Sequence, residues 1–127
     1  MVLLDSDILI DLLRGHPNAL AWSRSPRADV VAMCNFSELE LLAGCRDLAG
    51  QALIEKFVAR CTILCPSPDS MRLAARTYAK LRLRSGIGAN DALIAHTAIE
   101  HNVPLHTFNV KHYHDVPGLI TLQPYTR

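Results

Sequence analysis

Short apolar segments alternate with amphipathic segments along the whole chain. Residues 2–5 (VLLD) and 62–65 (TILC) are each a brief apolar run that is closed by an aspartate or by a following proline. Such runs are typical of strands that are buried on both faces of a parallel sheet. The pattern predicts five strands, at residues 2–5, 29–33, 62–65, 103–109 and 119–123.

The segments between these runs have helical periodicity and end near glycine or proline. The first of them ends before Pro17, another has a break near Gly50, and Asn90 is placed to cap the last one. Helices are expected at residues 7–13, 36–46, 48–60, 69–85 and 90–102. Strands that alternate with helices predict an α/β fold around a mainly parallel sheet.

Length and composition are those of one soluble domain over residues 1–127. Half of the residues are hydrophobic, which is enough for a core without disulfides or a structural metal. No run approaches the roughly 18 apolar residues of a membrane helix, and the N-terminus has no basic leader. We therefore expect a cytoplasmic protein. The four cysteines form no C-x-x-C pair, so buried free thiols are expected.

Acidic and amide side chains fall where the predicted strands end. Asp5 closes the first strand, Glu38 and Glu40 follow the second, Asp91 opens the helix before the fourth, and Asn109 ends the fourth. Ligands of open parallel sheets bind beyond the carboxyl ends of the strands. The sequence therefore allows these residues to converge at one edge of the sheet.

Such a set of carboxylates favours a metal-dependent nuclease. Gathered carboxylates repel one another unless a cation lies between them, and oxygen ligands favour Mg²⁺ or Mn²⁺. A cation of this kind supports phosphodiester hydrolysis. Each residue alone also has an ordinary role: Asp5 can cap a helix, Asp91 can favour a helix dipole, Glu40 can be solvated and Asn109 can lie in a turn. The ordered set carries the hypothesis.

Only one of the two neighbouring glutamates faces the predicted site. At 100° per residue, Glu38 and Glu40 differ by about 200° around a helix. Glu40 shares its side with Ser37 and Gly44, whose small size leaves room for a metal and its waters. An apolar face is expected to anchor this helix on the sheet; it consists of Phe36, Leu39 and Ala43. We expect Glu40 in the site, with Glu38 as the alternative, at a rim or paired with a partner's arginine.

Four stretches of the chain carry a family resemblance. They are LLDSDILIDLL, SELELLAG, NDALIAHTAIEHNVPLHTFN and NVKHYHDVPGL. Together they resemble the PIN-domain ribonucleases of the VapC toxin family over essentially the whole chain. The resemblance implies a PIN-like three-layer α/β/α sandwich and an endoribonuclease that depends on Mg²⁺ or Mn²⁺. It also implies neutralisation by a cognate VapB-type antitoxin in a type II toxin–antitoxin system, and a homodimer that can join a higher-order toxin–antitoxin assembly.

The resemblance assigns the catalytic and metal-binding positions residue by residue. By position they are Asp5, Glu40, Asp91 and Asn109. The family pattern of Glu followed by Leu-x-x-Gly picks Glu40, with Leu41 and Gly44 in register. The fourth position is often aspartate in the family, and the neutral amide of Asn109 binds a divalent cation more weakly, which leaves the number of metals open. Asp115, six residues on, is a candidate to compensate.

The distribution of basic residues offers a candidate RNA surface, although the net charge is only +1. One face of a predicted helix carries Arg72, Arg76 and Lys80. These residues could bind RNA phosphates or form a solvated face. Aromatic residues are few, so base stacking is not evident. His112 is a candidate phosphate contact or support for Asn109, whereas the histidine spacing does not resemble a zinc site.

Two other functions remain open from the sequence. The DSD of residues 5–7 is similar to the D-x-D of aspartate-nucleophile phosphatases, with Asp5 as nucleophile and Asp7 as acid/base. The short chain and the lack of a well-placed phosphate-binding lysine count against this function. A non-catalytic PIN-like module that binds RNA or protein is the other alternative, and retention of at least three acidic residues counts against it.

Overall fold

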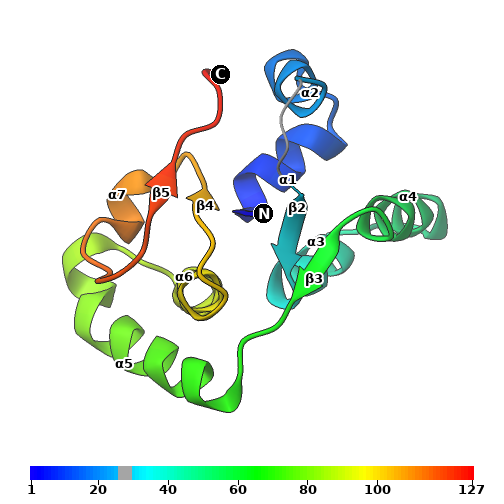
Figure 1. The fold of residues 1–127 in the computed structure, drawn as a ribbon. Coiled ribbons are helices and arrows are strands. Elements are labelled where there is room, and N and C mark those ends of the chain that lie inside the picture. The colour runs from blue at the N-terminus through cyan, green and yellow to red at the C-terminus, as the bar shows by residue number, and fades with distance from the viewer. Residues whose placement is uncertain (26–29) are drawn as a thin grey trace.

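The computed structural model describes residues 1–25 and 30–127, which fold around a parallel sheet (Figure 1). Over these residues the strands are β1 (Val2–Leu4), β2 (Val31–Cys34), β3 (Thr62–Leu64), β4 (Leu105–His106) and β5 (Thr121–Leu122). Their order in the sheet is β3-β2-β1-β4-β5, and every adjacent pair is parallel. The sheet confirms the predicted α/β class. The predicted start of the second strand, Asp29, lies outside the described residues.

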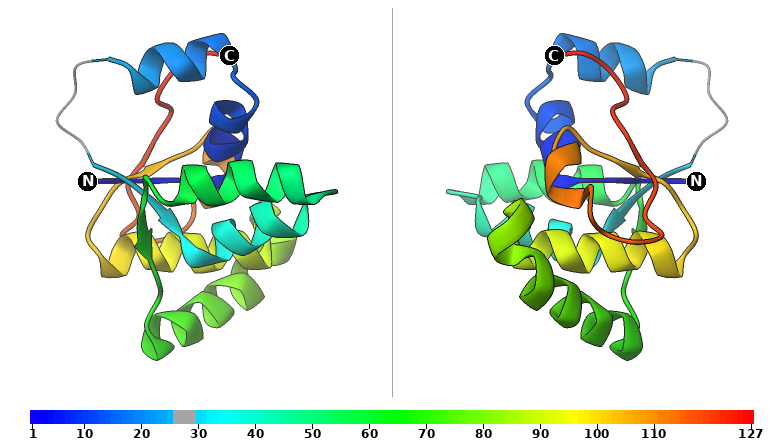
Figure 2. Two further views of the ribbon diagram at one scale, coloured as in Figure 1. Left: turned by 90° about the vertical axis from the view of Figure 1, so that its right-hand side faces the viewer. Right: turned by 90° about the vertical axis from the view of Figure 1, so that its left-hand side faces the viewer.

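Helices cover both faces of the sheet. They are α1 (Ser6–Leu13), α2 (Pro17–Ser23), α3 (Asn35–Ala43), α4 (Leu48–Val58), α5 (Pro68–Ser85), α6 (Ala89–Glu100) and α7 (Val110–Tyr113). Figure 2 shows α5 and α6 on the opposite side of the sheet from α1 and α2. The arrangement is the expected three-layer sandwich.

Alternation along β1 divides the core between the two layers. Leu3 belongs to the cluster packed against α5 and α6, where Ile94 and Ala95 are buried. Val2 and Leu4 point the other way and pack in the cluster that contains Ile8 of α1. Successive side chains of a strand point to opposite faces, so a run that is apolar at every position is buried from both sides. This explains why β1 lies in the centre of the sheet.

Predicted and observed helix ends differ by up to three residues, and three boundary signals have other roles in the structure. Gly88, not Asn90, is the N-cap residue of α6, and its N–H donates to the Asp91 carboxylate. Gly50 lies inside an unbroken α4. Pro17 begins α2 in addition to following α1, because proline suits the first turn of a helix, whose N–H groups have no helical partner.

The strand before Asn109 is also shorter than predicted. β4 ends at His106, and Asn109 instead lies at the N-cap position of the short helix α7. The loop between them turns the chain across the end of β1. As a result, residues 107–113 lie above the carboxyl end of the sheet.

The C-terminal segment returns to α1 and α2 (Figure 2). The Asn18 side-chain amide donates to the Thr126 carbonyl at 2.6 Å. Arg127 makes two bonds to Asp11 of α1, at 2.9 and 3.2 Å, and its guanidinium lies 4.2 Å from the centre of the Phe108 ring. The last residues thereby fix α1 relative to the loop that follows β4.

The thiols only partly match the prediction, and no span for a membrane is found. Cys34 is buried, whereas Cys65 is exposed, and the four cysteines are free. The Cys34 thiol lies 3.5 Å from Thr97 Oγ1, and burial raises its pKa. Within the described part of the chain, every helix is too short or too polar to cross a bilayer.

Candidate functional site

Asp5 is the buried centre of the candidate site. It follows β1 directly and is 2 % exposed. It also caps α1: its Oδ1 accepts the Ser6 N–H at 2.9 Å, so the expected capping role is confirmed. Its own N–H donates to the His106 carbonyl at 3.0 Å, which continues the parallel pairing with β4. Two strands therefore fix the backbone from which this carboxylate projects.

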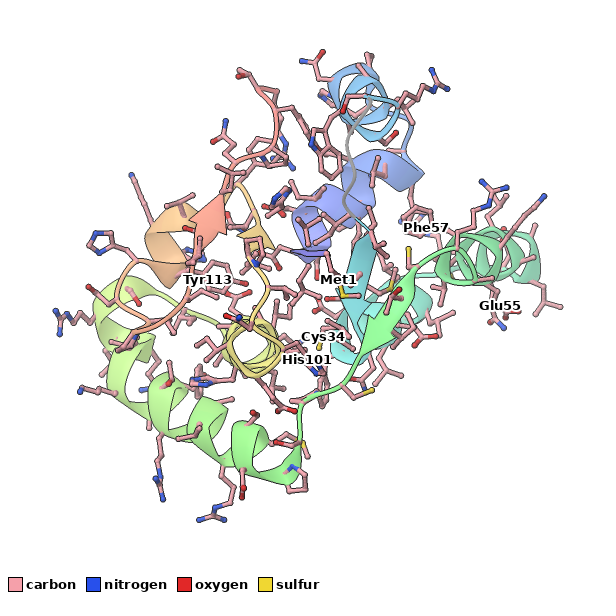
Figure 3. The ribbon with its side chains drawn as sticks, in the orientation of Figure 1. Met1, Cys34, Glu55, Phe57, His101 and Tyr113 are labelled. Atoms are coloured by element: carbon pink, nitrogen blue, oxygen red, sulfur yellow. The ribbon has the colours of Figure 1, made fainter. Side chains whose placement is uncertain are left out.

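A tyrosine joins Asp5 to Asp91 across the site. The Tyr113 hydroxyl lies 3.0 Å from Asp5 Oδ2 and 3.3 Å from Asp91 Oδ1. Tyr113 comes from α7 and is buried (Figure 3). A phenol has a single proton, so it donates to one of the two carboxylates at a time. Asp5 and Asp91 are 86 positions apart in the sequence. In the fold, one oxygen of each lies within hydrogen-bonding distance of the same Tyr113 hydroxyl.

Thr107 completes the surroundings of Asp5. Its hydroxyl donates to Asp5 Oδ2 at 2.8 Å and accepts the Asn109 N–H at 3.0 Å. Asp7, in the first turn of α1, accepts the N–H groups of Ile8 at 2.8 Å and of Phe108 at 2.9 Å. The loop after β4 is thus bound to the start of α1 through both aspartates.

Burial and repulsion make the negative charge of Asp5 costly. Desolvation, and next the negative charge of Asp7, raise the pKa of Asp5 from 3.8 to about 6, and Asp91 adds to the rise. Burial also raises the pKa of Asp7. Burial and the charges of Asp5 and Asp91 raise the pKa of Tyr113, so its hydroxyl keeps its proton. A cation between Asp5 and Asp91 would offset this repulsion.

Asp91 is held by the turn before α6. Its Oδ2 accepts the Gly88 N–H at 2.9 Å, and a Cβ added at Gly88 would lie 3.3 Å from the same oxygen. His112 Nδ1 lies 3.7 Å from Asp91 Oδ2. Among the described residues, this buried nitrogen has no hydrogen-bond partner. The expected position of His112 beside the site is therefore found, with the imidazole facing Asp91.

Serine hydroxyls connect Glu40 to the start of α1. Its Oε1 lies 3.4 Å from the Ser6 hydroxyl, which in turn lies 3.3 Å from the hydroxyl of Ser37. Glu40 is exposed, whereas Ser37 is fully buried. Because both contact Ser6, the predicted stripe of Ser37, Glu40 and Gly44 faces α1. Glu38 lies on the other side of α3, two positions away.

The expected apolar face of α3 is partly wrong. Phe36 does pack against the core, but Leu39 is 57 % exposed and Ala43 is exposed as well. Ser37 and Leu41 are the buried positions instead. The helix is turned so that the side with Ser37 and Leu41 packs inward, where α3 contacts α1 and α6.

Asn109 and Asp115 are arranged differently from the sequence prediction. Asn109 is exposed, and its link to the site is the bond from its backbone N–H to Thr107. Asp115 pairs with Arg84 of α5 at 3.5 Å and accepts from His114 at 3.3 Å. Asp115 therefore acts as a partner of α5. The assignment of Asn109 to the site stays a prediction.

The donor set suits a hard divalent cation. Asp5 and Asp91 supply carboxylate oxygens at one point, and Mg²⁺ is commonly held by one or two carboxylates together with waters and substrate phosphates. Over the described residues, no three histidine, cysteine or acidic side chains lie close enough to form a complete metal cage. Glu40 and Asn109 are both exposed to solvent. The residues fit a cation that is shared with a substrate.

Thr107 and Tyr113 are the site residues that sequence reasoning missed. Neither has a chemically distinctive type, and their partner Asp5 is more than 100 positions away. One signal was available: Tyr113 follows Asn109 by four residues, one helical turn, so the two would share a helix face.

Comparisons with known proteins agree with the fold and with the resemblance. The PIN domain model matches residues 2–118. "Ribonuclease VapC19" of Mycobacterium tuberculosis is 34% identical over 122 residues, which cover 94% of this chain and 97% of that protein. "Ribonuclease VapC" of Rickettsia bellii is 33% identical over 133 residues, covering 95% of this chain and 94% of the relative.

A solved structure extends the agreement to three dimensions. VapBC-1 from nontypeable Haemophilus influenzae superposes with a TM-score of 0.77 at 27% identity, and the match covers 98% of both chains. Since the domain model spans most of the sequence and the relatives match it from end to end, the chain belongs to the PIN-domain family of VapC proteins.

Proposed function

We propose that this protein is the toxin of a type II toxin–antitoxin pair and an endoribonuclease that hydrolyses RNA phosphodiester bonds with Mg²⁺ or Mn²⁺ in the cytoplasm. The observation that carries the proposal is the meeting of Asp5 and Asp91 at the Tyr113 hydroxyl, beyond the carboxyl end of β1. The names of the similar VapC proteins support the reaction class.

In this proposal Asp5 and Asp91 hold the cation, and Glu40 and Asn109 approach it from the open side. A divalent cation in this position supplies a Lewis acid for hydrolysis of a phosphodiester. The chain supplies the positioning: Ser6 orients Glu40, Thr107 and Tyr113 orient Asp5, and the Gly88 N–H orients Asp91. Each carboxylate thus has at least one donor that fixes its direction.

Cleavage of total RNA by the purified protein tests the proposal. We expect cleavage with Mg²⁺ or Mn²⁺ that stops in EDTA, and no cleavage by Asp5→Asn or Asp91→Asn. Asp69→Asn, on the exposed first turn of α5, is the matched control and should cleave normally. Full activity of Asp5→Asn would contradict the proposal. Hydrolysis of a small aryl phosphate with a phosphoaspartate on Asp5 would identify a phosphatase, and RNA binding without cleavage would identify a binding module.

We further propose that an antitoxin binds between α1 and α4. A groove there is lined by the apolar residues Leu12, Leu13, Leu53 and Phe57 and by the basic residues Lys56 and Arg60 (Figure 3 labels Phe57). A second apolar groove continues past Leu41 and reaches Glu40. A partner segment lying along both grooves would cover the open side of the site. The VapBC assembly formed by the Haemophilus relative supports a partner of this kind.

Two substitutions test whether this surface, rather than any exposed leucine, binds the antitoxin. Leu53 on α4 is 66% exposed and Leu83 on α5 is 88% exposed. Leu53→Asp should weaken binding to an antitoxin encoded beside this gene by at least about tenfold, because it places a charge in an apolar contact, while Leu83→Asp should not. Calorimetry with the purified pair measures both. Equal losses would place the antitoxin elsewhere.

A homodimer is also part of the proposed function. The apolar hollow between α5 and α6 is lined by Met71, Ala74, Ala75, Tyr78, Ala89 and Leu93, and a second copy of the chain would cover it. Ala75→Glu should convert a dimer to a monomer in sedimentation equilibrium. A wild-type chain that sediments as a monomer at all concentrations would rule out this assembly.

A further inference from the structure

Four cations form a continuous row along α5. Arg72, Arg76, Lys80 and Arg84 are spaced by four residues, and all four are exposed. Neighbours in this row are about 6 Å apart along the helix axis, and each is rotated by about 40° from the one before. The row therefore winds slowly around the helix, so that its two ends face different directions. We call Arg72 and Arg76 the distal pair, and Lys80 and Arg84 the proximal pair.

The proximal pair lies beside a groove that the distal pair does not reach. Lys80 and Arg84 line this groove together with Thr77, Leu81, Asp115 and Pro117. Asp115 is the acidic residue among them, and its 3.5 Å pair with Arg84 holds the guanidinium at the groove. The Arg84 side chain is still 68% exposed, so N–H donors remain available to a ligand.

The proximal pair also leads directly to the candidate site. α5 ends at Ser85 and is capped by Gly86, whose φ of +72° turns the chain toward α6. A Cβ at Gly86 would lie 3.8 Å from His112 Nε2, and the other ring nitrogen of His112 is 3.7 Å from Asp91. The turn at Gly86 and the imidazole of His112 therefore lie between the groove and the carboxylates of Asp5 and Asp91.

We propose that Lys80 and Arg84 bind the phosphates that neighbour the cleaved phosphate on the same RNA strand. In this proposal the strand leaves the site along the C-terminal half of α5. This inference rests on the proposed ribonuclease function. A row of cations that leads into a carboxylate site suits a polyanion whose reacting phosphate lies at that site and whose remaining phosphates need counter-charges.

Two features favour side-chain binding of a phosphate backbone over a general attraction of anions. The net charge is only +1, so the protein as a whole attracts nucleic acid weakly. The C-terminal end of α5 has a negative helix dipole, so the backbone there does not attract phosphate. Binding in this groove must therefore come from Lys80 and Arg84 themselves.

RNA binding without cleavage tests the inference. The probe is a fluorescein-labelled RNA hairpin with single-stranded ends, titrated in EDTA and followed by anisotropy at several salt concentrations. The proximal variant Lys80→Gln/Arg84→Gln is compared with the distal variant Arg72→Gln/Arg76→Gln, which removes the same charge from the same helix. Loss of two phosphate contacts should lower the slope of log Kd against log salt by about 1.4, and weaken binding roughly 25-fold at 0.1 M salt. The distal variant should stay close to wild type.

Two results would overturn the inference. Equal losses in both variants would indicate a general charge effect of α5. No loss of RNA affinity in the proximal variant would exclude the groove as an RNA surface, and lost antitoxin binding in that same variant would then assign Lys80 and Arg84 to a protein partner. Failure of the ribonuclease function would look different, because the wild type would then bind the hairpin with the proximal dependence but leave it intact with Mn²⁺.

Discussion

The two halves of the candidate site differ in how firmly the fold holds them. Asp5 is buried, with bonds from Ser6, Thr107 and Tyr113, and its backbone belongs to the central strand. Glu40 is exposed and is reached by a single serine hydroxyl at 3.4 Å. The buried half is set before any ligand arrives, whereas the open half has freedom that a cation or substrate can remove. Substitutions in the buried half are therefore expected to change stability as well as activity, whereas substitutions in the open half should change activity alone.

Within the open half, the largest expected effect comes from the Glu40 carboxylate. Glu40→Gln should lower RNA cleavage by about a thousandfold, because it removes a carboxylate from the proposed cation. The free energy of unfolding should hardly change, since Glu40 is exposed. Glu38→Gln, on the same helix, is the control and should cleave within about threefold of wild type. The reverse pattern would mean that Glu38 is the site residue.

The second prediction concerns the buried half and pH. The folded-state pKa of Asp5 is about 6, above its ordinary 3.8, so the folded protein holds this proton more tightly than the unfolded chain. This contribution to stability is complete below about pH 3.8 and is lost as the pH rises through about 6. It should lower the free energy of unfolding of the metal-free protein by up to about 3 kcal/mol between those values.

Asp5→Asn isolates this contribution from the other titrating groups. Hydrogen bonds hold the pKa of Glu100 at about 2, and those from Tyr125 and Arg127 lower the pKa of Asp11, so these carboxylates act in the opposite direction. Urea unfolding in EDTA at a series of pH values gives the difference between wild type and variant. Parallel curves would contradict the assignment of a costly charge to Asp5.

A smaller effect is expected from the bridging hydroxyl. Tyr113→Phe removes a donor from two buried or half-buried carboxylates and should destabilise the metal-free protein by about 1–2 kcal/mol. Mn²⁺ binding, measured by calorimetry, should weaken about tenfold, as is usual when a residue that orients a ligand is lost. Tyr78→Phe on α5 is the control, with a change of less than about 0.5 kcal/mol. Tighter Mn²⁺ binding in Tyr113→Phe would show that the hydroxyl competes with the cation.

The smallest expected effect comes from adding a carboxylate to the open half instead of removing one. Asn109→Asp places a carboxylate where the chain has a neutral amide, and it should tighten Mn²⁺ binding about fivefold if Asn109 faces the cation. Calorimetry at constant pH measures the change. An unchanged affinity would leave Asn109 as a cap and turn residue at the start of α7.

The sequence was informative where local pattern and tertiary role coincide. The run VLL of β1 is apolar at every position because helices cover both faces, so the strand and the placement of Asp5 after it could be predicted. The side of α3 that carries Glu40 followed from helical geometry. Its burial did not, because packing against α1 and α6 left Leu39 exposed.

What the sequence missed depends on contacts between distant residues. Nothing near Tyr113 shows that its hydroxyl meets Asp5, 108 positions away. Gly88 has no side chain that would mark it as a helix cap, and the capping bond comes from Asp91 three residues later. Pro17 was interpreted as the end of one helix because its role at the start of the next depends on where the chain turns.

The position of β1 in the middle of the sheet also has a consequence for synthesis. The N-terminal strand needs β4 as a neighbour, and Asp5 needs Thr107 and Tyr113, which are translated about 100 residues later. An unfinished nascent chain therefore lacks both the strand pairing and the donors that define the acidic pair. In this topology a candidate residue that is synthesised early is completed by residues that are synthesised about 100 positions later, so the acidic pair of Asp5 and Asp91 exists only after Tyr113 has left the ribosome.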